Sequence, residues 1–174
     1  MQTIENIKSR RSVRKFKPEI PPAEHIREIV EAGTYAATGM NKQSPIIIAV
    51  TDRTVRNRLQ QDNAQIGGWR EGFDPFYGAP AILIVLADKT WANRVYDGSL
   101  VLGNMMLAAH ELGLGSCWIH RAKEEFEMPE WREWLQSLGI TGEYEGIGHL
   151  ALGYCDGEYP KTPIRKENWA YYVG

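Results

Sequence analysis

One segment constrains the fold more than any other: an apolar helix predicted over Asp97–Leu112, with the sequence DGSLVLGNMMLAAHEL. Its inward positions recur at helical spacing and form a wide stripe: Val101, Met105, Ala108 and Leu112, flanked by Leu100, Asn104 and Leu107. A helix this apolar belongs at the centre of the molecule or at a subunit interface. The rest of the chain must therefore pack around it, with or without the help of a second copy.

The remaining elements alternate irregularly along the chain. Apolar periodicity and flanking turn residues predict helices over residues 3–11, 22–37 and 53–63 and from Pro129 onward, and strands over 46–50, 81–87, 116–119 and 148–154. The sequence contains no repeat, low-complexity segment or linker. These features predict one α/β or α+β layered domain over residues 1–174.

Composition excludes several classes of protein. Hydrophobic residues make up 43% and charged residues 24%, with a net charge of −2, as in ordinary globular proteins and unlike most proteins that bind nucleic acid or anionic membranes. No apolar run approaches the roughly 20 residues that span a bilayer, and the N-terminus lacks a secretory signal pattern, so we expect a cytoplasmic protein. Cys117 and Cys155 are expected to be free thiols, and no Cys/His spacing predicts a metal site.

A cluster of cations follows the first predicted helix. Arg10, Arg11 and Arg14 surround Ser12, and a guanidinium presents a rigid fork of donors that matches phosphate oxygens. The cluster is therefore a candidate holder of a phosphorylated cofactor. Taken alone it is more typical of a solvated basic helix end, since short basic runs are weak motifs.

Two further segments make the cluster specific. The first is ATGMNKQSP, residues 37–45, and the second is NMMLAAHELGLGSCWI, residues 104–119, completed by LGY at 152–154 and PKTPIRK at 160–166. Together and in this order, the segments resemble the nitroreductase family of FMN-dependent oxidoreductases, over nearly the whole chain. The resemblance implies an α+β fold with an antiparallel-rich mixed sheet between helices. It also implies an intertwined homodimer with two FMN sites at the subunit interface.

The resemblance assigns roles to the N-terminal cluster through the family pattern R-x-S-x-R, which matches Arg10, Ser12 and Arg14. It implies that Arg10 holds the FMN phosphate. It places Arg14 near the pyrimidine end of the flavin, where a fixed positive charge would stabilise the negative charge that develops at N1 and O2 on reduction. For Arg11, a phosphate contact and a solvated side chain both stay open.

The segment after the second helix matches a family loop that usually borders the flavin of the partner subunit. The resemblance assigns cofactor contacts to Thr38, Gly39, Asn41 and Gln43. Thr38-Gly39 replaces the family's Pro-Ser, and Ile46 stands where a Trp is expected, which leaves only Thr38 to supply a hydroxyl. Asn41 is also a typical left-handed turn residue.

Two other segments complete the implied cofactor site. Trp118, Ile119 and His120 match the segment whose backbone N–H groups approach flavin N5 and O4, and His120 would act through its backbone. Lys161 and Arg165 match the basic residues that bind the phosphate after the last strand; a solvated tail is the alternative. The tail, residues 157–174, is rich in aromatic residues and is therefore expected to pack on something. The resemblance implies that it packs on the partner subunit, as family tails often do.

The implied activity is hydride transfer from NADH or NADPH, through flavin N5, to a nitroaromatic, quinone or similar electron-poor acceptor by a ping-pong mechanism. No catalytic side chain is required apart from Arg14 as a tuner of the flavin. Three alternatives stay open: a sibling flavin reaction such as reductive dehalogenation, enoate reduction or flavin breakdown, a non-enzymatic flavin-binding redox sensor, and a ligand-free structural dimer. The aromatic residues of the 65–78 loop either stack on a planar substrate or cover the core: Trp69, Phe73, Phe76 and Tyr77.

Overall fold

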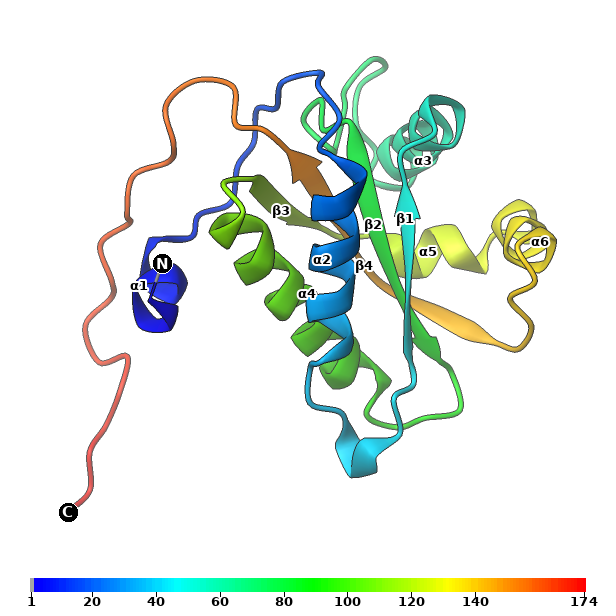
Figure 1. Ribbon diagram of the computed structural model, residues 1–174. Helices are drawn as coiled ribbons and strands as arrows, with labels where there is room; N and C mark the ends of the chain where they lie inside the picture. The colour runs from blue at the N-terminus through cyan, green and yellow to red at the C-terminus, as the bar shows by residue number, and fades with distance from the viewer. Residues whose placement is uncertain (1) are drawn as a thin grey trace.

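A four-stranded antiparallel sheet forms the centre of the computed structural model, which describes residues 2–174 (Figure 1). Its strands are β1 (Pro45–Val50), β2 (Ala81–Asp88), β3 (Gly115–Ile119) and β4 (Tyr144–Gly153), in the order β1-β2-β4-β3. Every neighbouring pair is antiparallel, and an isolated parallel bridge joins Ser12 to Ser116 at the β3 edge. The predicted α+β fold with an antiparallel-rich sheet is confirmed.

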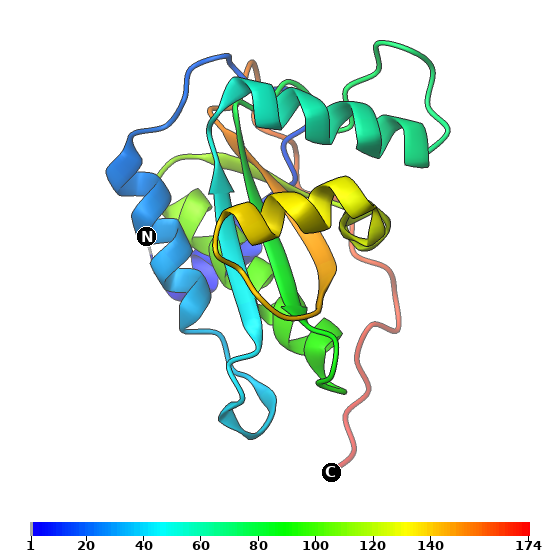
Figure 2. The same cartoon turned by 90° about the vertical axis from the view of Figure 1, so that its right-hand side faces the viewer.

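Helices cover both faces of this sheet. They are α1 (Thr3–Ser9), α2 (Ala23–Thr34), α3 (Arg53–Ile66), α4 (Arg94–Glu111), α5 (Ala122–Glu127) and α6 (Pro129–Ser137), with a short 3-10 turn, η1, at Gly39–Asn41. Helices α2 and α4 lie on one face, whereas α3, α5 and α6 lie on the other (Figures 1 and 2). The tail beyond β4 runs past α1, which brings the two ends of the chain to the same side of the molecule.

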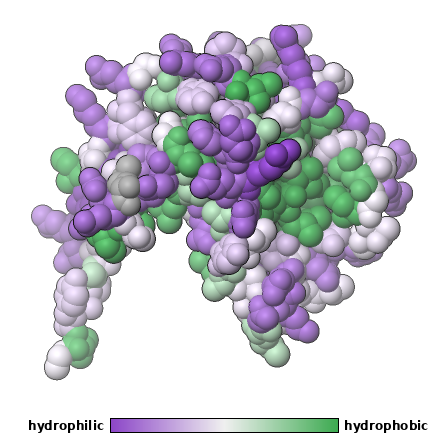
Figure 3. All heavy atoms as spheres, in the orientation of Figure 1, coloured by the Kyte–Doolittle hydropathy of each residue, from purple (hydrophilic) through white to green (hydrophobic). Residues whose placement is uncertain are grey.

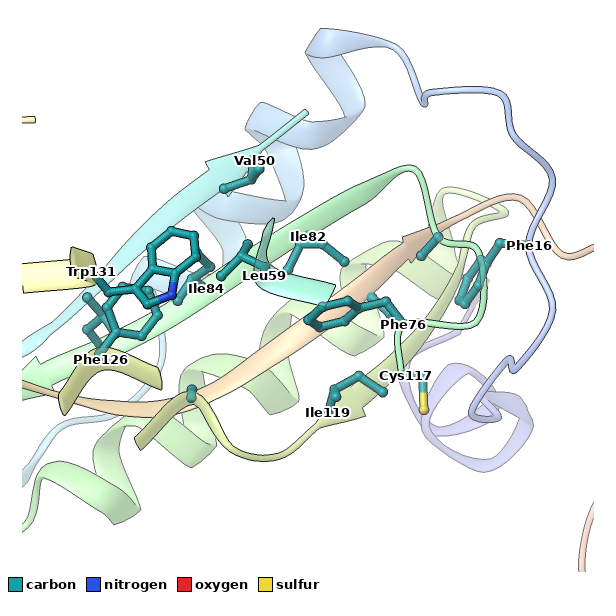
Figure 4. Packing of buried hydrophobic residues seen from close by; sticks show 14 of the residues in the cluster. Phe16, Val50, Leu59, Phe76, Ile82, Ile84, Cys117, Ile119, Phe126 and Trp131 are labelled. Atoms are coloured by element: carbon teal, nitrogen blue, oxygen red, sulfur yellow. The ribbon is translucent and has the colours of Figure 1, made fainter. Parts of the chain in front are cut away.

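The sheet separates two apolar clusters. On the α4 side, Leu83 of β2 packs with Leu102 and Met105, and all three are fully buried. On the other side, Phe76 and Trp131 pack against alternate residues of the same strand (Figure 4). The central position predicted for the apolar helix is therefore correct, although Leu100 at its border is 52% exposed.

Element boundaries differ from the predictions where local chemistry is ambiguous. Helix α1 ends at Ser9 rather than residue 11 because Arg10 adopts an extended ψ of 135°. Helix α2 ends at Thr34 rather than residue 37, and α4 begins at Arg94, three residues early. Strand β4 begins at Tyr144 instead of residue 148, since glycines weaken the strand pattern there.

Helix α5 was not predicted, and one glycine explains how closely it packs on β4. A side chain at Gly146 would place its Cβ 2.1 Å from the carbonyl oxygen of Ala122, at the start of α5. The helix has only six residues, too few for a periodic pattern to stand out. Its residues Glu125 and Phe126 are buried, and Phe126 packs in the cluster that contains Phe76 and Trp131.

Candidate functional site

A basic pocket of about 340 Å³ brings together cations from the two ends of the chain. Its lining consists of Arg10, Arg11, Ser12, Arg14, Pro160, Lys161, Pro163 and Arg165, which includes five cations and no carboxylate. The N-terminal segment is held against the sheet edge, because the Val13 N–H donates to the Ser116 carbonyl at 3.0 Å. Gly115 permits this approach, since a Cβ there would lie 2.7 Å from Val13 Cγ2. The structure thus brings six predicted site residues together in one pocket. Four come from the N-terminal segment and two from the tail, more than 145 positions further along the chain.

Arg10 has the side chain best suited to an added anion. Its Nη1 atom is buried and has no hydrogen-bond partner among the described residues. An unpartnered buried donor is costly, and a phosphate oxygen is the acceptor that a guanidinium fork matches best. The basic pocket therefore fits the phosphate of a cofactor such as FMN.

Arg11 shares one feature with its neighbour, a buried guanidinium nitrogen, Nε, without a hydrogen-bond partner among the described residues, but its other nitrogens are bonded. It is only 7% exposed, and its Nη1 atom donates to the carbonyls of Lys8 at 2.7 Å and Arg10 at 2.6 Å. Its Nη2 atom donates to the Thr162 hydroxyl. The solvated alternative for Arg11 is excluded, and the side chain ties the end of α1 to the tail. A phosphate contact from Arg11 stays a prediction.

Arg14 lies beside β3. The pKa of the Cys117 thiol is raised by burial, and this rise is partly offset by the positive charge of Arg14 and by a hydrogen bond from Ser12. The Ser12 and Arg14 side chains of the R-x-S-x-R pattern therefore lie close to β3. Strand β3 pairs with β4 on one side; on its other side, within residues 2–174, its one backbone pairing is the isolated bridge from Ser116 to Ser12.

The far end of β3 contains the segment predicted to approach the flavin ring. Trp118 packs in the α4-side cluster, Ile119 is buried in the opposite cluster, and the side chain of His120 is exposed. Directly after them, Arg121 has a left-handed backbone with φ 76°, unusual for a residue with a side chain. Strained backbone of this kind is concentrated at functional sites.

A buried polar network holds this turn in place. Asn63 of α3 is fully buried, and its amide nitrogen donates to the His120 carbonyl at 2.9 Å and to Glu125 Oε2 at 3.1 Å. Its amide oxygen accepts from Arg121 Nε at 3.1 Å. His149 Nε2 lies 2.9 Å from the same Glu125 oxygen, at ion-pair distance but outside hydrogen-bond geometry. The end of β3 is thus tied to α3, α5 and β4 at once.

The predicted cofactor loop lies at the other end of the molecule. Residues Met40, Asn41 and Gln43 all have positive φ, between 48° and 54°, and Gln43 Nε2 donates to Asn41 Oδ1 at 3.0 Å. The left-handed turn considered for Asn41 is therefore present. The Gln43 N–H donates to the Thr38 hydroxyl at 3.2 Å, so the four predicted residues of this loop form one compact turn.

Asp97, for which the sequence suggested no role, holds that loop. It is only 3% exposed, and it accepts the Gly39 N–H at 3.0 Å and the Trp91 indole N–H at 2.8 Å. Asp97 lies in the first turn of α4, whereas His110 lies in the last turn, next to the basic pocket. Thirteen residues of helix separate them by about 20 Å. The loop and the basic pocket of one chain therefore lie at opposite ends of α4.

The 65–78 loop divides into a core half and a surface half. Phe76 is fully buried and Tyr77 packs against the same cluster, so these two cover the core. Trp69 is 49% exposed and packs against Phe73 with a 4.9 Å centroid distance. The Arg121 guanidinium lies 5.8 Å from the Trp69 ring. Only the Trp69–Phe73 half, beside the end of β3, stays a candidate for contact with a planar substrate.

Sequence reasoning missed three residues that organise these regions: Asn63, Asp97 and Tyr159. Each is a polar residue whose partners come from distant segments, so no local pattern marks it. The one available signal was the position of Asp97 and Asn63 within otherwise amphipathic helices, where a buried polar residue requires a partner.

Residues 2–174 contain neither a membrane-spanning helix nor a cluster of metal ligands. No helix in this range is both long and apolar enough to cross a membrane. No group of three or more His, Cys, Asp or Glu side chains in the same range is arranged to hold a metal ion.

Comparison with known proteins places the chain in a family. The family model of the nitroreductase family matches residues 7–67 and 68–154, so the chain belongs to the nitroreductase family. A nitroreductase with bound FMN from Bacteroides fragilis shares 31% identity and a TM-score of 0.88, with all of both chains covered. A nitroreductase with bound FMN from Desulfitobacterium hafniense shares 25% identity, with a TM-score of 0.89 and the same full coverage.

A curated relative has a different named activity. The iodotyrosine deiodinase of Thermotoga neapolitana is 27% identical over 175 residues, which cover 90% of each chain. Membership of the family is thus shown, while relatives within it carry names for more than one reaction.

Proposed function

We propose that this protein is an FMN-dependent oxidoreductase that takes reducing equivalents from NADH or NADPH and delivers them to electron-poor aromatic or quinone acceptors. The basic pocket is the observation that carries the proposal. It gathers Arg10, Arg14, Lys161 and Arg165 around Ser12, and it leaves a buried guanidinium nitrogen without a partner. The FMN bound in nitroreductases of similar structure carries the phosphate that this pocket suits.

The chain's residues would act on the cofactor by binding and electrostatics. Arg10, Lys161 and Arg165 would bind the phosphate, and Arg14, beside the β3 edge, would stabilise negative charge at the pyrimidine end of the ring. The backbone at Ile119 and His120 would face the N5 edge, held by the Asn63 network. When bound between these residues, FMN would supply the redox chemistry, accepting hydride from the nicotinamide and passing it to the acceptor in ping-pong order.

A homodimer is part of the proposal because one chain separates the two halves of the implied site. The loop at Thr38–Gln43 lies about 20 Å along α4 from the basic pocket of its own chain and would border the flavin of the partner. Large apolar side chains are exposed: Ile4, Ile7, Met40, Tyr96, Leu100, Ile164 and Trp169. The C-terminal end of the tail stands apart from the body as an arm, as expected for a segment that packs on a partner (Figures 1 and 3).

The decisive experiment begins with purified protein and its visible spectrum. We expect flavin absorbance, or its appearance after addition of FMN, and rapid bleaching on anaerobic mixing with NADH or NADPH in a stopped-flow instrument. Sedimentation analysis should give a dimer. The absence of any FMN binding would refute the proposal, and FMN binding without reduction by either nicotinamide would indicate a non-enzymatic flavoprotein.

Reductive dehalogenation is the second candidate, favoured by the similarity to the Thermotoga deiodinase over 90% of both chains. Steady-state assays with a nitroarene, a quinone and a halogenated phenol separate the two. Release of halide at a rate comparable with nitroarene or quinone reduction would favour dehalogenation.

A further inference from the structure

Two tethers fasten the start of the tail to the body, and Lys161 lies between them. The first tether is Tyr159, whose hydroxyl accepts the Arg11 N–H at 2.7 Å. The second is Thr162, whose hydroxyl accepts from the Arg11 guanidinium. Before the tethers, the Asp156 N–H donates to the Lys15 carbonyl at 3.0 Å. The tail is thus held by hydrogen bonds as far as residue 162.

The ring of Tyr159 rests on His110 at the end of α4. The two rings are stacked at 15°, with centroids 5.4 Å apart, and the Tyr159 hydroxyl lies 3.2 Å from His110 Nδ1. His110 Nε2 lies 2.8 Å from the Ser9 hydroxyl, which donates to the Glu5 carbonyl at 2.8 Å.

The His110 ring thus contacts the tail through Nδ1 and α1 through Nε2. The Tyr159 hydroxyl joins this contact to the Arg11 N–H. Tyr159 is therefore tied both to the last turn of α4 and to the segment that follows α1.

We propose that Tyr159, oriented by His110 and Arg11, is the positioning residue that sets Lys161 and Arg165 opposite Arg10 and Arg14. The basic pocket depends on it because Lys161 lies between the two tethers: it follows Tyr159 by two residues and precedes Thr162 by one. Preassembled cations bind an anion more tightly than cations that must first be ordered. The ligand is a phosphate monoester at the end of a larger cofactor, so this inference rests on the proposed function for the identity of that ligand.

The test compares Tyr159→Phe with Tyr172→Phe in the full-length protein. Each variant loses one tail hydroxyl, but Tyr172 is 95% exposed, whereas Tyr159 is 39% exposed and its hydroxyl is hydrogen-bonded. FMN affinity is measured by fluorescence titration of the apoprotein. We expect about tenfold weaker binding for Tyr159→Phe, since two hydrogen bonds are lost, and unchanged binding for Tyr172→Phe. Thr162→Val should weaken binding in the same direction and by less.

A second readout needs no cofactor. Trypsin cleaves after Lys161, and the rate of this cut in the apoprotein reports how firmly the tail is held. We expect faster cleavage in Tyr159→Phe than in the wild type or Tyr172→Phe. If Tyr159→Phe were cleaved after Lys161 at the wild-type rate, the inference would be overturned. It would also be overturned if cleavage were faster while the affinity for FMN stayed unchanged. Failure of the wild type to bind FMN would instead overturn the proposed function, and the cleavage rates would still test the tether.

Discussion

The two halves of the implied cofactor site are built in opposite ways. The lining of the basic pocket comes from one chain: the segment after α1 and the tail supply its cations, which are held by Arg11, Tyr159 and Thr162. The loop at 38–43 is held at its base by Asp97, and its residues Met40, Asn41 and Gln43 are exposed and have positive φ. Under the proposed function, the difference means that a single chain would bind the phosphate, whereas the ring environment would require a second one.

The largest effect is expected from removing the anchor of the basic pocket. Arg10→Ala should weaken FMN binding about 50-fold, because hydrogen bonds to charged groups contribute about 1.5–3 kcal/mol each. Fluorescence titration measures the change, and Arg27→Ala, an exposed arginine on α2, is the control. Equal affinities for Arg10→Ala and Arg27→Ala would show that the pocket is not the phosphate site.

The second largest effect is expected from removing Asp97, which holds the base of the loop at 38–43. Asp97→Ala leaves the Gly39 N–H and the Trp91 indole N–H without their acceptor, which should lower the free energy of unfolding by about 2 kcal/mol. Urea denaturation measures the loss, with Glu28→Ala, on the exposed side of α2, as the control. A loss no greater than that of the control would mean that the loop is not held through Asp97.

A smaller effect is expected from two glycine substitutions in the loop, which distinguish the contribution of its backbone conformation from that of its side chains. Asn41→Gly keeps the left-handed backbone and removes the carboxamide, so FMN affinity should fall about fivefold while stability changes little. Met40→Gly, at φ 53° and 83% exposed, should leave affinity unchanged and stabilise slightly by relieving strain. If both variants bind FMN like the wild type, the loop does not contact the cofactor through Asn41.

The smallest effect is a pH dependence. Burial lowers the pKa of His110 below its ordinary value of about 6.5, and the charges of Arg10 and Arg11 lower it further, against an opposing effect of Glu111. The folded state therefore binds the proton less well than the unfolded state. The stability contributed by neutral His110 is fully present above about pH 6.5 and is lost as the pH falls through the lowered pKa.

Urea denaturation at pH 7 and pH 5.5 tests this expectation. The wild type should lose more stability than His110→Gln between the two pH values. An identical loss in both proteins would assign the pH dependence to other groups.

Periodicity and turn chemistry predicted most of the fold, since β2, α4 and α6 carry strong local patterns. The same rules missed α5, which is too short for a pattern, and the early start of β4, where Gly146 serves packing against α5 rather than a turn. The cations of the basic pocket could be named from the sequence because Arg10 and Lys161 belong to recognisable motifs. Tyr159, Asn63 and Asp97 could not, because their roles arise from contacts with residues 45 or more positions away.

The course of the tail has a thermodynamic consequence. Lys161 and Arg165 lie on the same short segment as Trp169 and Tyr172, which are 70% and 95% exposed in the single chain. If the aromatic part packs on a second subunit, this one segment takes part in two equilibria, cofactor binding and subunit association. Thermodynamic linkage then requires the two to be reciprocal. If the cofactor multiplies the association constant of the subunits by some factor, association multiplies the affinity for the cofactor by the same factor.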